Sequence, residues 1–543
     1  MNLWDPIWSY GRKMSREKLP GPRGVQPRTS CIRSLDDHRL SFNLPVRSGE
    51  RIVSPGLVLS RPSCQNSSLF GRCARTIRAS MRRAVRVGLL LLGVFFLDAG
   101  CNQLDARDGR LFDEFGREVL YHGVNARVAG LFDVTFNDGR QPVETVPPFG
   151  EVDCRFLSDE LGMNVLRLPV NWSGVEPQRG VYDQAYIQRI VRLVDECFEQ
   201  GVSTLIDFHQ DAWSKEIGED GAPLWAIIPP PTQLLQGPLT DLTARRLSEQ
   251  ALNAALSFFE NVDGLQDAFA AMAQQVARAL HGHPGAIGMD LMNEPLLIPG
   301  IQSADAIGPI DAFYRSVGAK VREVAPRLTL FYEPNSIRNL IDHIPVIGPF
   351  PLPNVVYAPH IYTGVFSSNP PDLPHLRASV AAAQSEAMTV GGPLFVGEWG
   401  TDPRTPAGLQ YLSDAMQAFD EARASWTFWV YEEVPPAVWG LWDTTPDLAT
   451  RTLRTAPADT LARPFPQAVD GELQTIQYDP TTRVLSVTIT PRHRGLPHRF
   501  SAPRRTYPDG VRATCDGREI GAWPDRGHVL LACEGSEITL APR

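Results

Sequence analysis

The sequence lacks any apolar run long enough to cross a bilayer as a helix, for which about 20 residues are needed. Its most apolar stretch, residues 87–97, has only eleven residues, so a multispanning membrane protein is excluded. Positive charge is scarce beyond residue 100. Of 52 Lys and Arg, 17 lie in the first 100 residues, as do only 6 of 61 Asp and Glu, so the remainder carries 35 basic against 55 acidic residues. An acidic body repels phosphate, which excludes nucleic acid as a partner.

A signal for export is predicted at residues 81–101. Three arginines precede the apolar run, which is followed by Asp98, Ala99, Gly100 and Cys101. A charged front, a short apolar middle and a small-residue end are typical of a secretory peptide, and the charged, proline-rich sequence upstream disfavours a buried core helix. The segment resembles a bacterial lipoprotein signal, although Asp98 stands where that motif has an aliphatic residue. We expect the protein to be either secreted or lipid-anchored through Cys101 to the cell envelope of a bacterium.

Residues 1–80 are rich in Arg, Pro and Ser and show no sustained apolar period. They precede a complete signal that has its own methionine, Met81. We expect this extension to be either untranslated in the natural product or disordered. Its three cysteines show no metal-ligand spacing.

Four cysteines follow Cys101, an even number in a chain expected to reach an oxidising compartment. We predict the disulfides Cys154–Cys197 and Cys515–Cys533, because each pair lies within one expected domain. Four cysteines allow three pairings, and four buried free thiols are the alternative.

Eight short apolar or β-branched runs alternate with segments of helical period, which is typical of a parallel sheet with crossover helices. The runs cover residues 119–125, 164–170, 202–209, 286–295, 327–334, 354–362, 393–400 and 425–432. Helical period is found, for instance, at residues 184–200, 265–280, 313–324 and 409–423. Eight such units predict an α/β fold, a TIM (β/α)8 barrel, in a catalytic domain at residues 105–455. Period-two alternation, as at 474–490, then predicts a small C-terminal antiparallel β-sandwich at residues 464–543.

Polar residues stand at the carboxyl end of almost every run, where the active site of a TIM barrel forms. They are His122, Asn125, Arg167, Asn171, His209, Asp211, Asn293, Glu294, Glu333, His360, Tyr362, Glu398 and Trp429. The connection at residues 210–264 contains the sequence LWAIIPPP, and we interpret it as an ordered apolar loop over the same face.

Two glutamates, Glu294 and Glu398, end the fourth and seventh runs. Cleavage of a glycosidic bond with retention needs two carboxyl groups about 5 Å apart, one to protonate the leaving oxygen and one to attack the anomeric carbon. We predict that Glu294 is the general acid/base and Glu398 the nucleophile. Arg167 and Tyr362 are expected to keep Glu398 ionised, while an apolar wall and the charge of Glu398 are expected to raise the pKa of Glu294. Glu333 ends the fifth run and fits this opposed pair less well.

Five motifs in chain order, LRLPVNW, DFHQD, LMNEP, PHIY and GEWG, resemble glycoside hydrolase family 5 over roughly residues 105–450. Within that family the chain is similar to the endoglycoceramidases, which cleave the bond between an oligosaccharide and ceramide in glycosphingolipids. The likeness is carried by residues 207–227 and by the segment PFPQAVDGE at residues 464–472. The second segment begins the expected β-sandwich, and the endoglycoceramidases have such a domain after the barrel. The resemblance implies a first sugar site lined by His209, Asp211, Asn293, Tyr362 and Trp429. It implies no nucleotide, flavin or metal cofactor.

Two further strand-end residues, Arg167 and His360, are predicted to bind substrate because they coincide with the two glutamates, although a lone histidine or arginine there is often purely structural. A lipid glycoside also requires an apolar groove beside the sugar cleft. The groove is predicted from Trp213, Leu224, Trp225, Ile227 and Ile228. These residues have an alternative role, which is to pack the long loop against the barrel. Trp439 and Trp442 either stack on sugar rings or are buried.

Other functions remain open on the sequence alone. One is a β-glucanase or cellulase of the same family that acts on polysaccharide. Another is a metal-dependent barrel hydrolase, suggested by His209 and Asp211, but the His-x-His pair expected at the first strand is missing. A third is a carbohydrate-binding lipoprotein without catalysis, which would gain nothing from a buried carboxylic acid.

Overall fold

The computed structural model describes residues 104–543, except residues 128–135, 137, 142–144, 238–240, 363 and 366–370. The predicted N-terminal extension and export signal lie outside this part. Within it, no helix combines the length and the apolar character that crossing a membrane requires.

Eight parallel strands form one sheet in the order β10-β11-β4-β5-β6-β7-β8-β9. Their bounds are β4 (His122–Asn125), β5 (Val165–Val170), β6 (Ser203–Phe208), β7 (Ala286–Asp290), β8 (Leu330–Tyr332), β9 (Val355–Tyr357), β10 (Phe395–Trp399) and β11 (Ser425–Phe428). A bridge between Tyr357 and Leu394 joins the two ends of this order. Each of the eight predicted runs contains one strand, so the predicted TIM-like barrel is confirmed.

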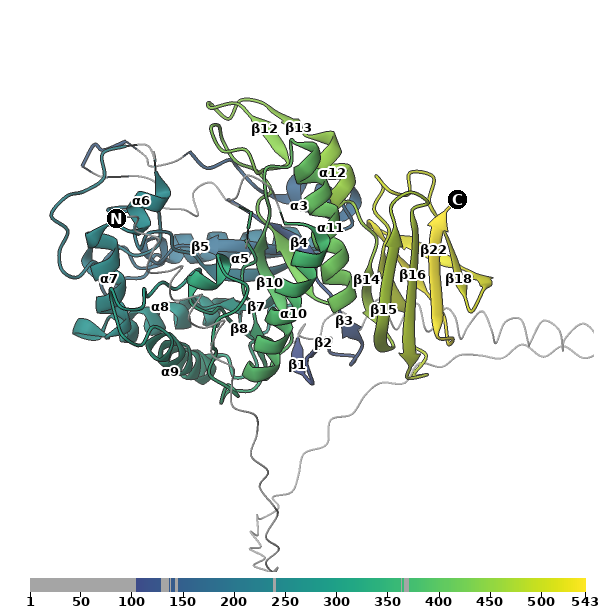
Figure 1. The fold of residues 1–543 in the computed structure, drawn as a ribbon, viewed down its shortest axis with the longest axis horizontal. Helices are drawn as coiled ribbons and strands as arrows, with labels where there is room; N and C mark the ends of the chain where they lie inside the picture. The colour runs from purple at the N-terminus through teal and green to yellow at the C-terminus, as the bar shows by residue number, and fades with distance from the viewer. Residues whose placement is uncertain are drawn as a thin grey trace, which may run out of the picture. The chain divides into compact units, whose positions relative to one another are not determined.

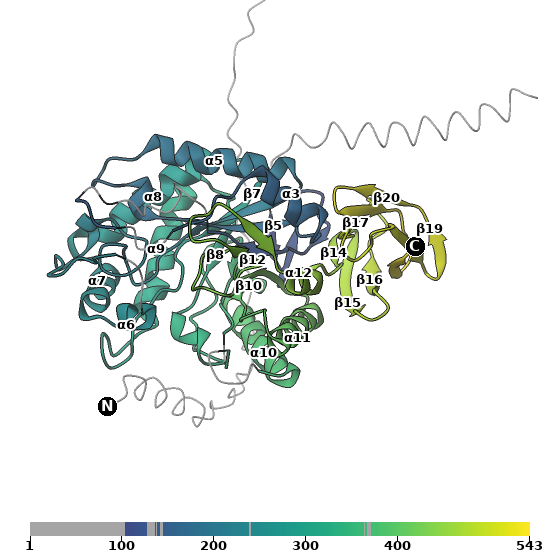
Figure 2. The same cartoon turned by 90° about the horizontal axis from the view of Figure 1, so that it is seen from above.

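Helices surround these strands (Figure 2). Their bounds are α3 (Glu151–Asp159), α4 (Trp172–Val175), α5 (Gln184–Glu199), α8 (Leu265–Leu280), α9 (Gly308–Val324), α10 (Leu373–Val390), α11 (Pro406–Ala422) and α12 (Thr455–Leu461). Helix α5 shows why they form. The Asp183 side chain accepts from the backbone N–H groups of Ala185 and Tyr186, and buried residues recur every three or four positions along the helix. All four predicted helical segments are helices.

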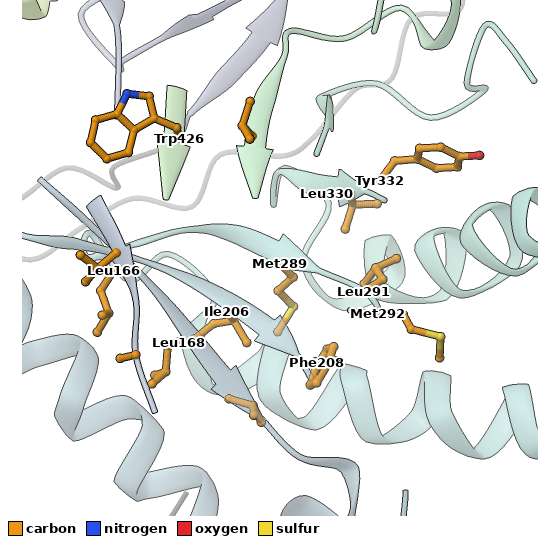
Figure 3. Packing of buried hydrophobic residues seen from close by; sticks show 14 of the residues in the cluster. Leu166, Leu168, Ile206, Phe208, Met289, Leu291, Met292, Leu330, Tyr332 and Trp426 are labelled. Atoms are coloured by element: carbon orange, nitrogen blue, oxygen red, sulfur yellow. The ribbon is translucent and has the colours of Figure 1, made fainter. Parts of the chain in front are cut away.

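Successive side chains of each barrel strand point alternately outward and inward, and they form two separate hydrophobic clusters. Outward residues pack against the helices, and Figure 3 shows part of this cluster, with Leu166, Leu168, Ile206 and Phe208 on β5 and β6. The inward residues of the barrel strands form a second cluster, together with residues from the segment before β4 and with Ala468. Its buried members are Leu104, Leu111, Val119, Val165, Leu205, Ile287, Phe331, Val356, Ala358, Phe395 and Ala468. Two residues further along β5 and β6, the inward side chains are Arg167 and Asp207, so one strand face changes from apolar to charged.

The described part of the long connection after β6 contains helices that the sequence pattern does not predict. They are η1 (Leu224–Ala226), α6 (Leu242–Arg246), α7 (Glu249–Phe259) and η2 (Val262–Gly264). Helix α7 buries Ala251, Ala254, Phe258 and Phe259, which explains the apolar content of this connection. Two smaller features lie elsewhere in the barrel domain, namely η3 (Ser336–Asn339) and the antiparallel pair of β12 (Trp442–Thr444) and β13 (Arg451–Leu453).

Two antiparallel sheets form the C-terminal part. One has the order β15-β16-β22-β18-β19, and β15, β16, β22 and β18 lie side by side in Figure 1. The other has the order β1-β2-β3-β14-β17-β21-β20. The C-terminal bounds are β14 (Pro466–Val469), β15 (Gly471–Asp479), β16 (Val484–Pro491), β17 (His498–Ser501), β18 (Val511–Cys515), β19 (Arg518–Ile520), β20 (Ala522–Asp525), β21 (His528–Leu531) and β22 (Glu537–Pro542).

The second sheet begins with three short strands from the start of the described chain, β1 (Asp105–Arg107), β2 (Arg110–Phe112) and β3 (Glu118–Val119). We had assigned residues 105–119 to the barrel segment. They instead pair with the C-terminal sheet, because Val119 of β3 is in register with Ala468 of β14. His122 also differs from the prediction, since it begins β4 and stacks between Trp426 and Phe465 rather than at the strand end.

Both predicted disulfides are present. Cys154 of α3 is bonded to Cys197 of α5, and Cys515 of β18 is bonded to Cys533. The alternative of four free thiols is therefore wrong.

Candidate active site

Glu294 follows β7 and Glu398 lies in β10, so two strand ends bring these carboxyl groups together. One carboxylate oxygen of each, with a ring nitrogen of His360, lies within 4.8 Å of the other two atoms. Retaining glycosidases hold their carboxyl groups about 5 to 5.5 Å apart, whereas inverting enzymes leave room for a water molecule at about 6.5 Å or more. The spacing therefore fits attack on the anomeric carbon by one of the two glutamates.

Arg167 of β5 is completely buried and fixes the floor of this site. Its Nη1 donates to Glu398 Oε1 at 2.8 Å and to Asn125 Oδ1 at 3.0 Å. Its Nη2 donates to Asn293 Oδ1 at 3.0 Å and to Asp290 Oδ2 at 2.9 Å. Because one rigid guanidinium contacts groups carried by β4, β7 and β10, it orients both glutamate-bearing strand ends.

Glu398 accepts hydrogen bonds on both oxygens. Arg167 donates to Oε1, and the Tyr362 hydroxyl donates to Oε2 at 3.0 Å. Burial raises the pKa of Glu398 to about 8, since it outweighs the charge of Arg167, and the negative charge of Glu294 adds to the effect. The two predicted donors are in place, but they do not by themselves keep this carboxyl ionised at neutral pH.

Glu294 is held by residues from three other segments. Oε1 accepts from Asn339 Nδ2 at 2.7 Å and faces His360 Nδ1 at 3.0 Å, and Oε2 lies 3.1 Å from Arg246 Nη1. Burial alone would raise the pKa of Glu294, but the charge of Arg246 and the hydrogen bond from His360 lower it below its ordinary value. The predicted order of the two pKa values is therefore wrong in this conformation, because an arginine replaces the expected apolar wall.

The backbone at Glu294 has a φ of +44°, in the left-handed region that side chains with a Cβ seldom adopt. Such strain, of about 1 to 2 kcal/mol, persists only where surrounding contacts fix the residue, and it is concentrated at functional sites. The contacts are present, since Gln210 Nε2 donates to the carbonyl oxygens of Asn293 and Glu294 at 2.8 and 3.1 Å.

Two aromatic rings stack beside Asn293. His209 and Trp429 are stacked with centroids 5.7 Å apart, and Asp207 accepts from His209 Nδ1 at 2.6 Å. Asn293 Nδ2 donates to the carbonyl of Gln210 at 3.1 Å, which fixes its amide. Flat aromatic faces beside fixed polar groups suit the apolar face and the hydroxyls of a sugar ring.

An apolar hollow adjoins Glu294. It is small and open to solvent, and the Glu294 side chain forms part of its wall. Its walls are Gln210, Asp211, Ala212, Trp213, Arg246, Ala251, Leu252, Ala255, Phe259, Met292, Glu294, Leu296 and Ser336. Of the five predicted groove residues only Trp213 lines it. Ile227 is buried, and Trp225 packs edge-on against Trp172 at 5.2 Å, which is the alternative role considered for these residues.

Among the described residues, Glu294, His360 and Glu398 form the one group of three side chains close enough to share a metal ion. The two guanidinium groups of Arg167 and Arg246 already neutralise these carboxylates. A divalent cation placed here would meet the positive charges of both arginines, so the donor set suits a shared proton better than a metal ion.

The predicted site residues thus meet at one place, while two contributors, Asn339 and Arg246, were not predicted. His360 is fully buried between the glutamates, and burial lowers its pKa to about 4, so it is a neutral donor. Asn339 comes from η3 and Arg246 from α6, and neither stands in a strand-end motif. Glu333 lies 3.4 Å from His360, and burial raises its pKa well above the ordinary value, which favours its protonated form.

The chain resembles known glycosidases over most of its length. A family model described as cellulase (glycosyl hydrolase family 5) matches residues 143–433, more than half of the chain. Endoglycoceramidase I of Rhodococcus hoagii is 27% identical over 458 residues, which cover 80% of this chain and 86% of that protein.

Solved structures show the same fold. Endo-glycoceramidase II from Rhodococcus sp., in complex with ganglioside GM3, has a TM-score of 0.66 at 23% identity, over 80% of this chain and 99% of that one. The same enzyme has been solved as a lactosyl-enzyme intermediate. An endogalactoceramidase has a TM-score of 0.67 at 24% identity, over 81% of this chain and all of that one.

Proposed function

The chain belongs to glycosyl hydrolase family 5, and on that basis we propose that it is a retaining endoglycoceramidase, which cleaves the β-glycosidic bond between the oligosaccharide and the ceramide of glycosphingolipids. The observation that carries the choice of substrate is the apolar hollow beside Glu294. A polysaccharide has a sugar on each side of the bond, whereas ceramide is apolar. The likeness to endoglycoceramidase I of Rhodococcus hoagii supports the same choice.

The proposed reaction has two steps. In the first, Glu398 attacks the anomeric carbon, the bond to the ceramide oxygen breaks, and Glu294 transfers its proton to that oxygen, so ceramide leaves as an alcohol. In the second, Glu294 takes a proton from water, whose oxygen attacks the anomeric carbon and releases Glu398 as a carboxylate. Two inversions give net retention, and the acid/base ends as it began.

The groups around the glutamates fit these roles. We assign Asn293 and the stacked rings of His209 and Trp429 to the sugar and the apolar hollow to the leaving group, because the hollow adjoins Glu294, the proposed general acid. Tyr362 and Arg167 donate to the two oxygens of Glu398, and these bonds orient it for attack.

We predict that the purified enzyme releases intact oligosaccharide and ceramide from lactosylceramide or a ganglioside in detergent. The reason is that the hollow buries an apolar aglycone while the strand-end residues bind the sugar. Mass spectrometry of both products checks the result. Release of glucose from cellotetraose, with no ceramide from any glycolipid, would instead point to the cellulase-type alternative.

Two variants of α7 separate the hollow from the rest of the fold. Ala255 lines it, whereas Ser257 lies on the same helix but not in the wall. Ala255→Phe is expected to raise KM for the glycolipid about 10-fold or more, as lost apolar contacts worth about 1.4 kcal/mol would do, and to leave β-lactosyl fluoride, which has no aglycone to fill the hollow, little affected. Ser257→Phe is the control, and equal effects of both changes would contradict the assignment of the hollow to ceramide.

We further propose that the protein is exported and acts at the cell envelope, where a substrate that resides in membranes would be met. The support is the arginine-flanked apolar run at residues 87–97 and Cys101 after it. Intact-mass measurement of the protein from membranes and medium is expected to show a chain without residues 81–97, with a lipid on Cys101 if it is anchored. A Cys101→Ser variant is the control. A mature chain that keeps the apolar run would overturn the proposal.

A further inference from the structure

Arg246 of α6 has no counterpart in the strand-end motifs, yet it contacts two residues of the site. Its Nη1 lies 3.1 Å from Glu294 Oε2, and its Nη2 makes a short contact with Asp211 Oδ1. We propose that Arg246 is a positioning residue that holds Glu294 ionised in the free enzyme and gives up this ion pair when the leaving group enters. This inference rests on the proposed role of Glu294 as general acid.

The two oxygens of Glu294 are unequal. Oε1 accepts from Asn339 at 2.7 Å and faces His360 Nδ1 at 3.0 Å, and both of these partners are buried. Oε2 faces Arg246. A general acid must carry its proton on an oxygen that can reach the glycosidic oxygen. Oε1 already receives hydrogen bonds from two fixed donors, so the proton belongs on Oε2, and a proton there is incompatible with an arginine donor at 3.1 Å.

Arg246 can leave because α6 is loosely attached. None of the described residues of this five-residue helix is buried, and the Arg246 side chain is 33% exposed. Besides Arg246, the helix is tied to the connection by Arg245, which donates to the carbonyl of Gly218 at 3.2 Å. Arg246 also lines the apolar hollow, so an aglycone that fills the hollow lies against its side chain and competes for its place.

The ion pair has a consequence for pH dependence. The charged or titratable groups facing Glu294 are Arg246, His360, Asp211, Glu398, Glu333 and Tyr362. Of these, only Arg246 carries a permanent positive charge in contact with the carboxylate. A nearby cation favours the ionised carboxylate and lowers its pKa, and a general acid loses activity as the pH rises through that pKa. The alkaline limb of kcat/KM, which reports the free enzyme, is therefore set in part by Arg246.

We predict that Arg246→Gln moves the alkaline limb of kcat/KM upward by about 1 pH unit or more, the shift that one adjacent cation causes. The limb of kcat should not move, because the ion pair is already broken in the substrate complex. Arg246→Lys keeps the charge and should restore the wild-type limb. The substrate is phenyl β-lactoside, whose poor leaving group requires the acid.

The neighbouring Arg245→Gln variant is the matched control, since it weakens the attachment of α6 without removing charge from Glu294. The proposal would be overturned if the alkaline limb of kcat/KM lay at the same pH in Arg246→Gln and in the wild type. It would also be overturned if Arg245→Gln moved this limb as far as Arg246→Gln does, or if the limb of kcat in Arg246→Gln moved by the same amount as that of kcat/KM. Failure of the proposed substrate is a separate outcome, because phenyl lactoside can be cleaved by an enzyme that leaves glycolipids intact. Cleavage of neither would overturn both.

Discussion

Glu398→Gln is expected to lower kcat on lactosylceramide by about 10⁴-fold or more, the scale of loss when a covalent nucleophile is removed. Glutamine has the same shape and can still accept from Arg167, which now donates to Oε1 at 2.8 Å, so the site should stay assembled. Its amide cannot attack the anomeric carbon. Initial rates and thermal unfolding of both proteins measure the result, with the unfolding temperature expected to change little.

Glu333→Gln is the matched control for this loss. Glu333 follows β8 and is buried beside His360. Burial raises its pKa well above the ordinary value. A neutral glutamine therefore reproduces the neutral acid, and the activity should stay within about 10-fold of wild type. NMR of the first-formed anomer completes the test, since net inversion would remove the nucleophile assignment altogether.

Glu294→Ala is expected to lower turnover of a glycolipid by about 10² to 10⁴-fold, the contribution of a general acid/base. A substrate with a good leaving group needs no protonation, so its first step should survive. The second step then lacks its base, and the glycosyl-enzyme should accumulate with a burst of leaving group. Intact mass of the quenched enzyme detects it.

Azide distinguishes the two glutamates. It needs no base and fits the space left by Glu294, so it should restore turnover of Glu294→Ala and give a glycosyl azide of retained configuration. Azide added to Glu398→Ala would attack in place of the nucleophile and give the inverted azide. If the two products were exchanged, the acid/base and the nucleophile would have been assigned the wrong way round.

The barrel could be predicted because its signals are local. A buried parallel strand is a short apolar run, and the change to a polar side chain at its end, as in β6 before His209 or at Glu398 of β10, is visible in a few consecutive residues. The three strands β1 to β3 have two or three residues each, too few to show alternation. The strand that pairs with β3 is β14, in the C-terminal part of the chain, so no local sequence pattern predicts this pairing.

Arg246 and Asn339 could not be predicted for a related reason. Arg246 stands 35 residues beyond Asp211, in a charged segment that reads as solvent-exposed helix, and only the return of α6 over the strand ends brings it to Glu294. The order of the two pKa values was wrong because it depended on this one cation. The predicted groove residues were wrong for a different reason. The sequence shows that Ile227 is apolar, but it does not show which side of the loop packs against the barrel, and Ile227 is buried there.

The pairing of β3 with β14 ties the beginning of the folded chain to a strand about 350 residues later. During synthesis, and during passage through an export channel if the proposed signal is used, the first strands emerge long before their partner exists. Strand β3 therefore lacks its partner β14 while the whole barrel is made, and the inward core stays incomplete, since it needs both Leu111 and Ala468. The fold can therefore be completed only late, after the C-terminal part that contains β14 is present.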